Sequence, residues 1–148
     1  MSWGRVLAAV MMLLWSFSIG AQQQSAEVPG AETEITLPPA PTLENLEAGV
    51  RSQVNDLRQA VEGLIADETA STRVVGTAVG QLGSLYLLYD FIEAAEDCLV
   101  TARRLDPENF FWPYFLGALY TLVGQPEKAE EALTGALEVK PGDLPTLI

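Results

Sequence analysis

The sequence predicts an all-α protein in which helix-turn-helix repeats stack as a short right-handed α-solenoid, preceded by a long helix. Three observations support this fold class. Apolar residues recur at helical spacing over residues 43–66, the segment 76–109 is repeated once as 110–143, and glycine and proline stand at the turns of that repeat. The chain has 148 residues, of which 49% are hydrophobic and 19% charged. It is therefore long enough for one small domain with tails.

The first 21 residues are typical of a secretory signal peptide. Arg5 precedes an apolar run over residues 6–17, small residues follow at 18–21, and polar glutamines come next. The apolar stretch 6–19 is shorter than the ~20 residues that span a membrane as a helix. We therefore expect a cleaved signal and an exported, periplasmic protein. The alternative is an uncleaved segment that anchors the chain in the inner membrane through residues 6–19.

Residues 22–41 differ in composition from the rest of the chain. They contain four prolines, three glutamates and three glutamines, with few large apolar side chains. Such a segment cannot bury enough apolar surface to offset the entropy cost of ordering. We expect a disordered linker here, with a proline-rich docking peptide as the alternative.

A long helix with its following loop is expected over residues 42–72. Thr42 is a candidate N-cap, and apolar residues then recur at steps of three and four up to about Ala66. The opposite face is charged, so the apolar stripe either packs on the helices that follow or forms a coiled-coil dimer seam. The stripe lasts only about three heptads, which favours packing within the chain. We interpret this helix as an N-terminal cap or a degenerate repeat unit.

Residues 76–109 and 110–143 align without a gap as an internal repeat. Eleven of the aligned positions are identical, among them Leu82/Leu116, Gly83/Gly117, Tyr86/Tyr120, Ala95/Ala129, Leu99/Leu133, Ala102/Ala136 and Pro107/Pro141. The repeats are expected to fill residues 73–148, as two full units and the start of a third. The small residues allow close helix approach, and the prolines end the second helix of each unit.

The turn inside each unit is built from different residues. In the second unit, Gly124 ends one helix and Pro126 opens the next. In the first unit Asp90 stands where Gly124 stands in the second, and Asp90 with Glu93 is predicted to form a capping box for a helix over residues 91–105.

These repeated residues resemble the signature of the tetratricopeptide repeat (TPR) family, over about half of the mature chain. The aromatic residue that the family carries early in each first helix is replaced by Val79 and by Pro113. The resemblance implies a groove that binds a peptide or a helix of a protein partner and is lined by the first helix of each unit. Carried over to this sequence, the groove residues are Thr77, Gly80, Ser84, Leu87 and Leu88, then Phe111, Tyr114, Ala118, Thr121 and Leu122.

The predicted groove residues include no lysine or arginine. A clamp that grips a C-terminal carboxylate is therefore not expected, and an apolar peptide or helix fits better. Packing on the neighbouring unit is the alternative role for several of these side chains, above all Leu88 and Leu122. In the aromatic run 110–115, residues spread around the helix axis, so one or two should be exposed, with Phe111 and Tyr114 the best candidates for binding.

Composition argues against most other functions. The formal charge of −12 disfavours nucleic acid as a partner. The chain has no histidine and one cysteine, Cys98, which is predicted to lie in the core. The glutamates near the starts of the second helices fit helix-dipole stabilisation better than catalysis or calcium binding. We therefore expect no enzymatic activity, no cofactor and no metal.

The sequence thus predicts a non-enzymatic protein–protein interaction scaffold. The alternative is a homo-oligomerising structural module, a homodimer formed through helix 43–66 or through the end around residues 144–148. Those last residues are apolar and fall where a third unit would begin. A repeat array normally ends in a polar capping helix. We therefore expect either a fragment of a longer array or a face that another chain covers. A membrane is a partner only if the N-terminal segment stays uncleaved.

Overall fold

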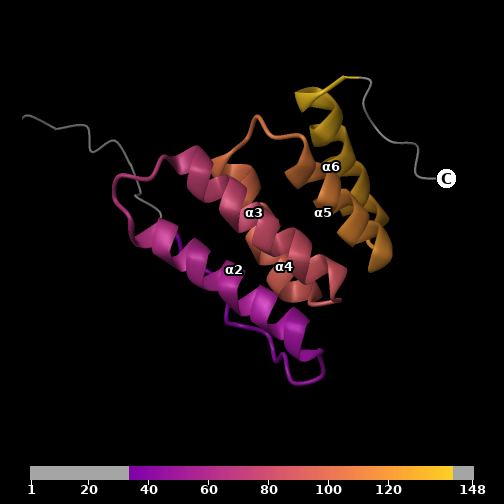
Figure 1. Ribbon diagram of the computed structural model, residues 1–148. Helices are drawn as coiled ribbons and strands as arrows, with labels where there is room; N and C mark the ends of the chain where they lie inside the picture. The colour runs from indigo at the N-terminus through magenta and orange to yellow at the C-terminus, as the bar shows by residue number, and fades with distance from the viewer. Residues whose placement is uncertain (1–33, 142–148) are drawn as a thin grey trace, which may run out of the picture. The chain divides into compact units, whose positions relative to one another are not determined.

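The computed structural model describes residues 34–141, which form an all-helical domain (Figure 1). Within these residues five helices pack in chain order, and α3 with α4 and α5 with α6 form antiparallel pairs. The α4–α5 contact joins the two pairs, and α2 packs on α3. The helices are α2 (Ala48–Ala66), α3 (Thr72–Leu88), α4 (Ile92–Leu105), α5 (Phe111–Leu122) and α6 (Pro126–Val139).

Helix α2 is shorter than predicted at its N-terminal end. Its N-cap is Glu47, and Thr42 caps nothing. Residues 43–46 form a turn in which the Leu46 N–H donates to the Leu43 carbonyl (3.1 Å). The Arg51 guanidinium donates to the Leu46 carbonyl (3.0 Å) and so fixes this turn on the first turns of α2. Leu43 reaches the core from the turn, which explains why its spacing matched that of a helix.

The apolar stripe of α2 packs inside the chain, as predicted. Val54 and Val61 are fully buried, and Val50, Leu57 and Leu64 pack on the same core. These residues follow the three-and-four spacing of one helix face. The seam that a coiled-coil dimer would need is therefore already occupied.

Part of the predicted linker is packed on the domain. Ile35 and Leu37 contact the core, and Arg58 of α2 donates to the Pro38 carbonyl (2.8 Å). The same guanidinium donates to the Tyr86 hydroxyl of α3 (3.1 Å) and pairs with Glu62 (2.9 Å). Burial raises the pKa of Tyr86. From Ile35 on, the chain is thus held to the domain by the apolar contacts of Ile35 and Leu37 and by the hydrogen bond from Arg58. The composition of this segment did not predict these contacts.

The two helix pairs are built with the same hydrogen bonds at equivalent positions of the repeat. The Phe91 N–H donates to the Tyr86 carbonyl (3.0 Å), and the Gln125 N–H donates to the Tyr120 carbonyl (2.8 Å). These bonds close the turn between the two helices of each pair. The sequence repeat is therefore also a repeat of local structure.

The helices of each pair approach closely at a glycine. A Cβ placed on Gly83 would lie 2.9 Å from Cys98 Cβ and 3.0 Å from Leu99 Cγ. A Cβ on Gly117 would lie 2.5 Å from Leu133 Cδ2. A larger residue at Gly83 would press on Cβ of Cys98 and the backbone of Leu99, and one at Gly117 would force the Leu133 side chain to move. This crowding explains why the repeat carries glycine at both crossings.

The predicted capping box of α4 does not form. Phe91 is the N-cap of α4 and makes no side-chain cap, while Asp90 adopts φ 62°. Gly124 adopts φ 71° at the same place in the second pair. Asp90, in the turn between α3 and α4, therefore adopts the left-handed conformation that glycine adopts without strain.

Residues 1–33 and 142–148 lie outside the described part of the chain. The predicted signal peptide, most of the linker 22–41 and the apolar segment 144–148 fall there. Among the helices of residues 34–141, none combines the length and the apolarity that crossing a membrane requires.

The two turns predict opposite effects of matched substitutions. Asp90→Gly should raise the free energy of unfolding by about 0.5–1 kcal/mol, because glycine removes the left-handed strain. Gly124→Ala should lower it by about 1 kcal/mol, since nothing lies within 4 Å of the added methyl group and only the backbone is strained. Urea unfolding followed by circular dichroism measures both, and a destabilised Asp90→Gly variant would contradict the assignment.

Candidate functional site

Six of the predicted groove residues lie on one stripe of α3 and α5, which we call the α3/α5 face. By helical spacing, Thr77, Ser84 and Leu88 share a side of α3, and their equivalents in the second repeat unit are Phe111, Ala118 and Leu122 of α5. Leu88, Phe111 and Leu122 are exposed by 71%, 57% and 64%. The alternative role of Leu88 and Leu122, packing on the neighbouring unit, is not what the structure shows. Thr77, Ser84 and Ala118 are half-buried.

The other predicted groove residues have partners within the domain. Gly80 is buried, and a Cβ on it would lie 2.6 Å from ring atoms of Trp112. Leu87 packs on the core, and Tyr114 is half-buried and stacks on Phe110 at 5.6 Å between ring centroids. Thr121 is exposed, and its hydroxyl donates to the Gly117 carbonyl (2.8 Å). Gly80 thus sets the approach of α5 to α3 and offers no surface of its own.

The aromatic run 110–115 divides between core and surface as helical geometry requires. Trp112 is buried, with 4% exposed, while Phe111 is exposed. Phe111 stacks on Phe115 at 6.3 Å and meets Phe110 edge-on at 5.8 Å. These contacts hold the Phe111 ring in place. The ring would therefore lose little conformational entropy if a ligand covered it.

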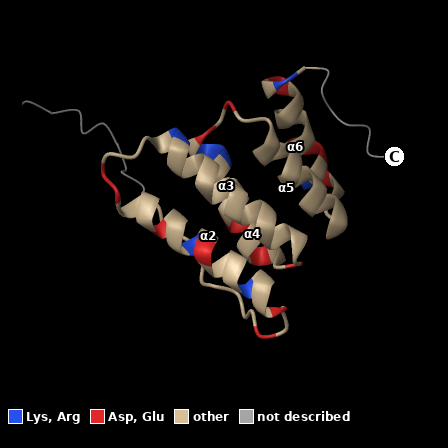
Figure 2. Ribbon diagram, in the orientation of Figure 1, with Lys and Arg blue, Asp and Glu red and all other residues tan. Residues whose placement is uncertain are grey.

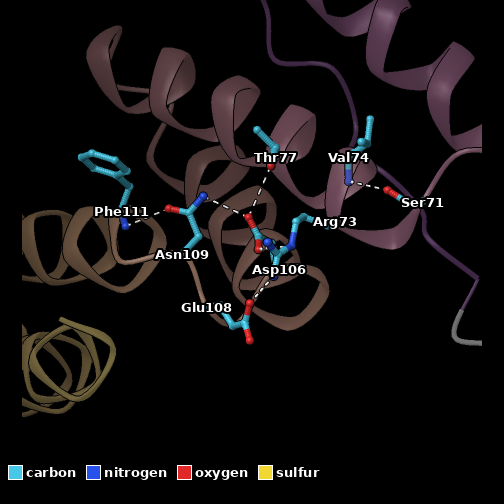
Figure 3. A network of polar contacts seen from close by, with 8 residues as sticks. All are labelled: Ser71, Arg73, Val74, Thr77, Asp106, Glu108, Asn109 and Phe111. Atoms are coloured by element: carbon cyan, nitrogen blue, oxygen red, sulfur yellow. Dashed lines mark hydrogen bonds and ion pairs between the residues drawn. The ribbon is translucent and has the colours of Figure 1, made fainter.

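A polar network that the sequence analysis missed lies beside this end of the face (Figure 3). Asp106, 5% exposed, is the one buried charged residue in the described part of the chain. Its carboxylate accepts from Asn109 Nδ2 (2.9 Å) and Thr77 Oγ1 (3.3 Å), and Arg73 Nε lies 3.6 Å away. The side-chain oxygen of Asn109, Oδ1, in turn accepts from the Phe111 N–H (3.1 Å).

This network ties together the start of α3, the end of α4 and the start of α5 (Figure 3). Asn109 satisfies one of the free N–H groups at the start of α5, and Arg73 also pairs with Glu108. A signal was present in the sequence, since Asp106 and Asn109 flank the proline turn 107–108, where short polar side chains bond to nearby backbone. The partner residues Thr77 and Arg73 lie on a different helix and could not be found from spacing.

Two hollows bear on the site, one beside Phe111 of the α3/α5 face and one on α6. One, of about 350 Å³, lies beside Phe111 and is lined by Arg73, Thr77, Asp106, Asn109 and Lys140, among others. The second, of about 450 Å³, lies between the end of α5 and the outer side of α6 and is lined mainly by apolar groups, including Ala129, Leu133 and Leu137. The hollow beside Phe111 is polar and its lining residues form ion pairs, whereas the hollow on α6 is open and mainly apolar.

Cys98 and the acidic side chains are the groups that the sequence offers for chemistry. Cys98 is buried, as predicted, and burial raises the pKa of its thiol to about 12. A thiol of this kind is protonated at neutral pH and inert. Within residues 34–141, no three acidic or cysteine side chains come together in a way that could hold a metal ion. The large exposed apolar side chains of the α3/α5 face are Leu88, Phe111 and Leu122.

Comparisons of the chain with protein-family models, with curated proteins and with solved structures found no match.

The contact between Gly80 and Trp112 predicts a large effect of one methyl group. Gly80→Ala should lower the free energy of unfolding by about 1–3 kcal/mol, because the indole ring cannot move away without disturbing the core. Gly63→Ala in α2 is the matched control, with nothing within 4 Å of its added methyl group. The control should be stabilised by about 0.5–1 kcal/mol through helix propensity. Equal effects of the two substitutions in urea titrations would contradict the contact.

The burial of Cys98 predicts slow thiol chemistry. At pH 8 the native chain should react with a disulfide reagent on the order of a hundredfold or more slower than the urea-unfolded chain, because folding disfavours the thiolate. As a control, Val100→Cys in a Cys98→Ala background places the thiol on the exposed side of α4. That variant should react at nearly the unfolded rate, and fast labelling of native Cys98 would show that the core opens readily.

The same thiol predicts how stability depends on pH. A thiol whose pKa is raised by folding stabilises the folded state below its unfolded pKa of ~8.5. That contribution is lost as the pH rises from there towards the folded pKa of about 12. The free energy of unfolding should fall over this window and fall less in Cys98→Ala. Tyr120, whose pKa burial also raises to about 12, accounts for part of the remaining decline. An identical decline in both proteins would contradict the burial of the thiol.

Proposed function

We propose that the protein is a non-enzymatic protein–protein interaction scaffold of the tetratricopeptide repeat type, which binds an apolar peptide or helix of a partner on the α3/α5 face. The observation that carries this proposal is the exposure of Leu88, Phe111 and Leu122 along one stripe of two adjacent helices. Large apolar side chains gathered on one face of a soluble domain are typical of an interaction site.

The repeat geometry supports the family resemblance. Both helix pairs close their turns with the same hydrogen bonds and cross at an equivalent glycine. In both, the residue after the first helix takes a positive φ, at Asp90 and at Gly124. Helices α3 and α5 are also in contact, as stacked units of a solenoid would require. A right-handed solenoid groove is therefore the arrangement we propose for α3 and α5.

The uncharged, apolar character of the face favours a partner with apolar side chains. The stripe from Thr77 to Leu122 carries no charged residue, and Arg73 at its edge pairs with Asp106 and Glu108. A free C-terminal carboxylate would find no uncommitted arginine here. We propose that the partner inserts apolar side chains against Leu88, Phe111 and Leu122, with the protein exported to the periplasm by its N-terminal segment.

A second candidate function rests on the open side of α6. In the first helix pair, Ala95 and Leu99 of α4 are fully buried, and α5 packs on α4. The equivalent residues of α6 are Ala129, which is buried, and Leu133, which is half-buried against Gly117. Both line the hollow of about 450 Å³ together with Leu137, which is exposed. Self-association through this surface is the alternative proposal. Helix α2 is a poorer candidate, because its apolar stripe is buried within the chain.

Substitutions on the face should remove binding without destabilising the fold. Peptides selected from a random display library against the full chain should lose about tenfold or more in affinity with Leu88→Lys/Leu122→Lys, because each leucine contributes about 1.5 kcal/mol when buried by a ligand. The free energy of unfolding should not fall, since both side chains face solvent.

Two matched variants control for this experiment. Val100→Lys adds a lysine at another exposed apolar position, on α4, and should leave peptide affinity unchanged. Leu137→Lys alters the open side of α6 and should change only self-association, measured by light scattering across concentrations. Selected peptides that bind the Leu88→Lys/Leu122→Lys variant as tightly as the unaltered chain would rule out the proposed face.

A further inference from the structure

One end of the α3/α5 face combines its two most exposed leucines with two helix C-termini. Leu88 is the last residue of α3 and Leu122 the last residue of α5. The helices pack sequentially and antiparallel, so α3 and α5 run in the same direction and finish at the same end (Figure 1). The aligned peptide dipoles place partial negative charge at each of these ends.

Neither helix end carries a cation of its own. The last turns of α3 and α5 contain no basic residue, whereas α4 ends with Arg103 and Arg104 in its last turn. The turn after α3 adds a negative charge, because Asp90 is exposed and makes no ion pair with another described residue. Figure 2 shows acidic residues, and no basic ones, at the turn between α3 and α4.

The opposite end of the face has the reverse character. Arg73 lies near Thr77 and Phe111, and Lys140 lines the hollow there. The Arg73 guanidinium is paired with Asp106 and Glu108. The face is therefore apolar along its length, with Arg73 and Lys140 at the Phe111 end. Near the Leu122 end, Lys128 of α6 lies 5.1 Å from the Tyr120 ring centroid, but it is paired with Glu96 (3.7 Å). The negative ends of the two helix dipoles and the carboxylate of Asp90 remain at the Leu88 and Leu122 end.

We propose that the Leu88 and Leu122 end binds an apolar segment that also carries lysine or arginine, such as a cationic amphipathic helix. The apolar side chains would cover the two leucines, and the basic groups would meet the two helix C-termini and Asp90. The formal charge of −12 on the chain adds long-range attraction for such a partner. This inference rests on the proposed function, because it specifies the partner of the same face.

The test uses three fluorescein-labelled amphipathic peptides that share one leucine stripe. Their polar positions are all lysine, all glutamine or all glutamate. Binding to the full 148-residue chain is followed by fluorescence anisotropy at low and high salt. The lysine peptide should bind about tenfold or more tightly than the glutamine peptide at low salt, and the glutamate peptide should bind least.

Variants of the chain separate specific binding from general attraction. Leu88→Ser/Leu122→Ser should weaken the lysine peptide about tenfold or more, by loss of apolar contact. Asp90→Asn should weaken it about twofold to fivefold and reduce the salt dependence, as expected for one exposed charge. Glu44→Gln, which removes one exposed charge before α2, is the matched control and should change nothing beyond a small uniform effect.

The other outcomes distinguish failure of the cation preference from failure of the proposed function. If the lysine and glutamine peptides bind equally and both depend on Leu88 and Leu122, the cation preference is overturned and the proposed function stands. If the lysine peptide binds but ignores the leucine variant, its binding is general attraction to an acidic protein and the inference is overturned. If none of the peptides binds, the inference fails, and the display selection decides separately whether the face binds other ligands.

Discussion

The close crossing of paired helices at glycine is the constraint on which the rest of the structure depends. A Cβ would lie 2.9 Å from Cys98 Cβ at Gly83, 2.5 Å from Leu133 Cδ2 at Gly117 and 2.6 Å from the Trp112 ring at Gly80. These contacts fix how each pair closes and how α5 meets α3. Once those sides of α3 and α5 are committed to packing, the stripe that ends in Leu88 and Leu122 must face outward. The exposed apolar face therefore follows from the packing.

The helices could be predicted from the sequence because the apolar residues that each helix buries recur at a spacing of three and four. The alignment of the two repeat units located both helix pairs and their glycine crossings, and the stripe of α2 correctly indicated packing within the chain. Periodicity failed at Leu43, which enters the core from a turn, and composition failed at Ile35 and Leu37, which lie in a proline-rich stretch yet contact the core. In the candidate site, exposure of Phe111 was predictable from helix geometry, but the contacts of Asp106 with Thr77 and Arg73 depend on tertiary structure.

The Asp106 network holds the Phe111 end of the α3/α5 face, the surface that we propose for binding. A buried carboxylate is costly unless hydrogen-bonded, and here Asn109, Thr77 and Arg73 surround it. Asn109 then fixes the first turn of α5 and with it the position of Phe111. At the other end, the equivalent turns at Asp90 and Gly124 set where Leu88 and Leu122 stand. Pre-organisation of this kind lowers the entropy cost of binding a flexible peptide.

Solvent accessibility of the leucine methyl groups tests the central claim most directly. In a methyl-labelled sample with a soluble paramagnetic agent, the account predicts strong broadening at Leu88 and Leu122 and weak broadening at the buried Leu82 and Leu116. The pattern should hold at all protein concentrations, with a monomer mass from light scattering on the same samples. Protection of Leu88 and Leu122, whether constant or appearing with association, would contradict an open α3/α5 face.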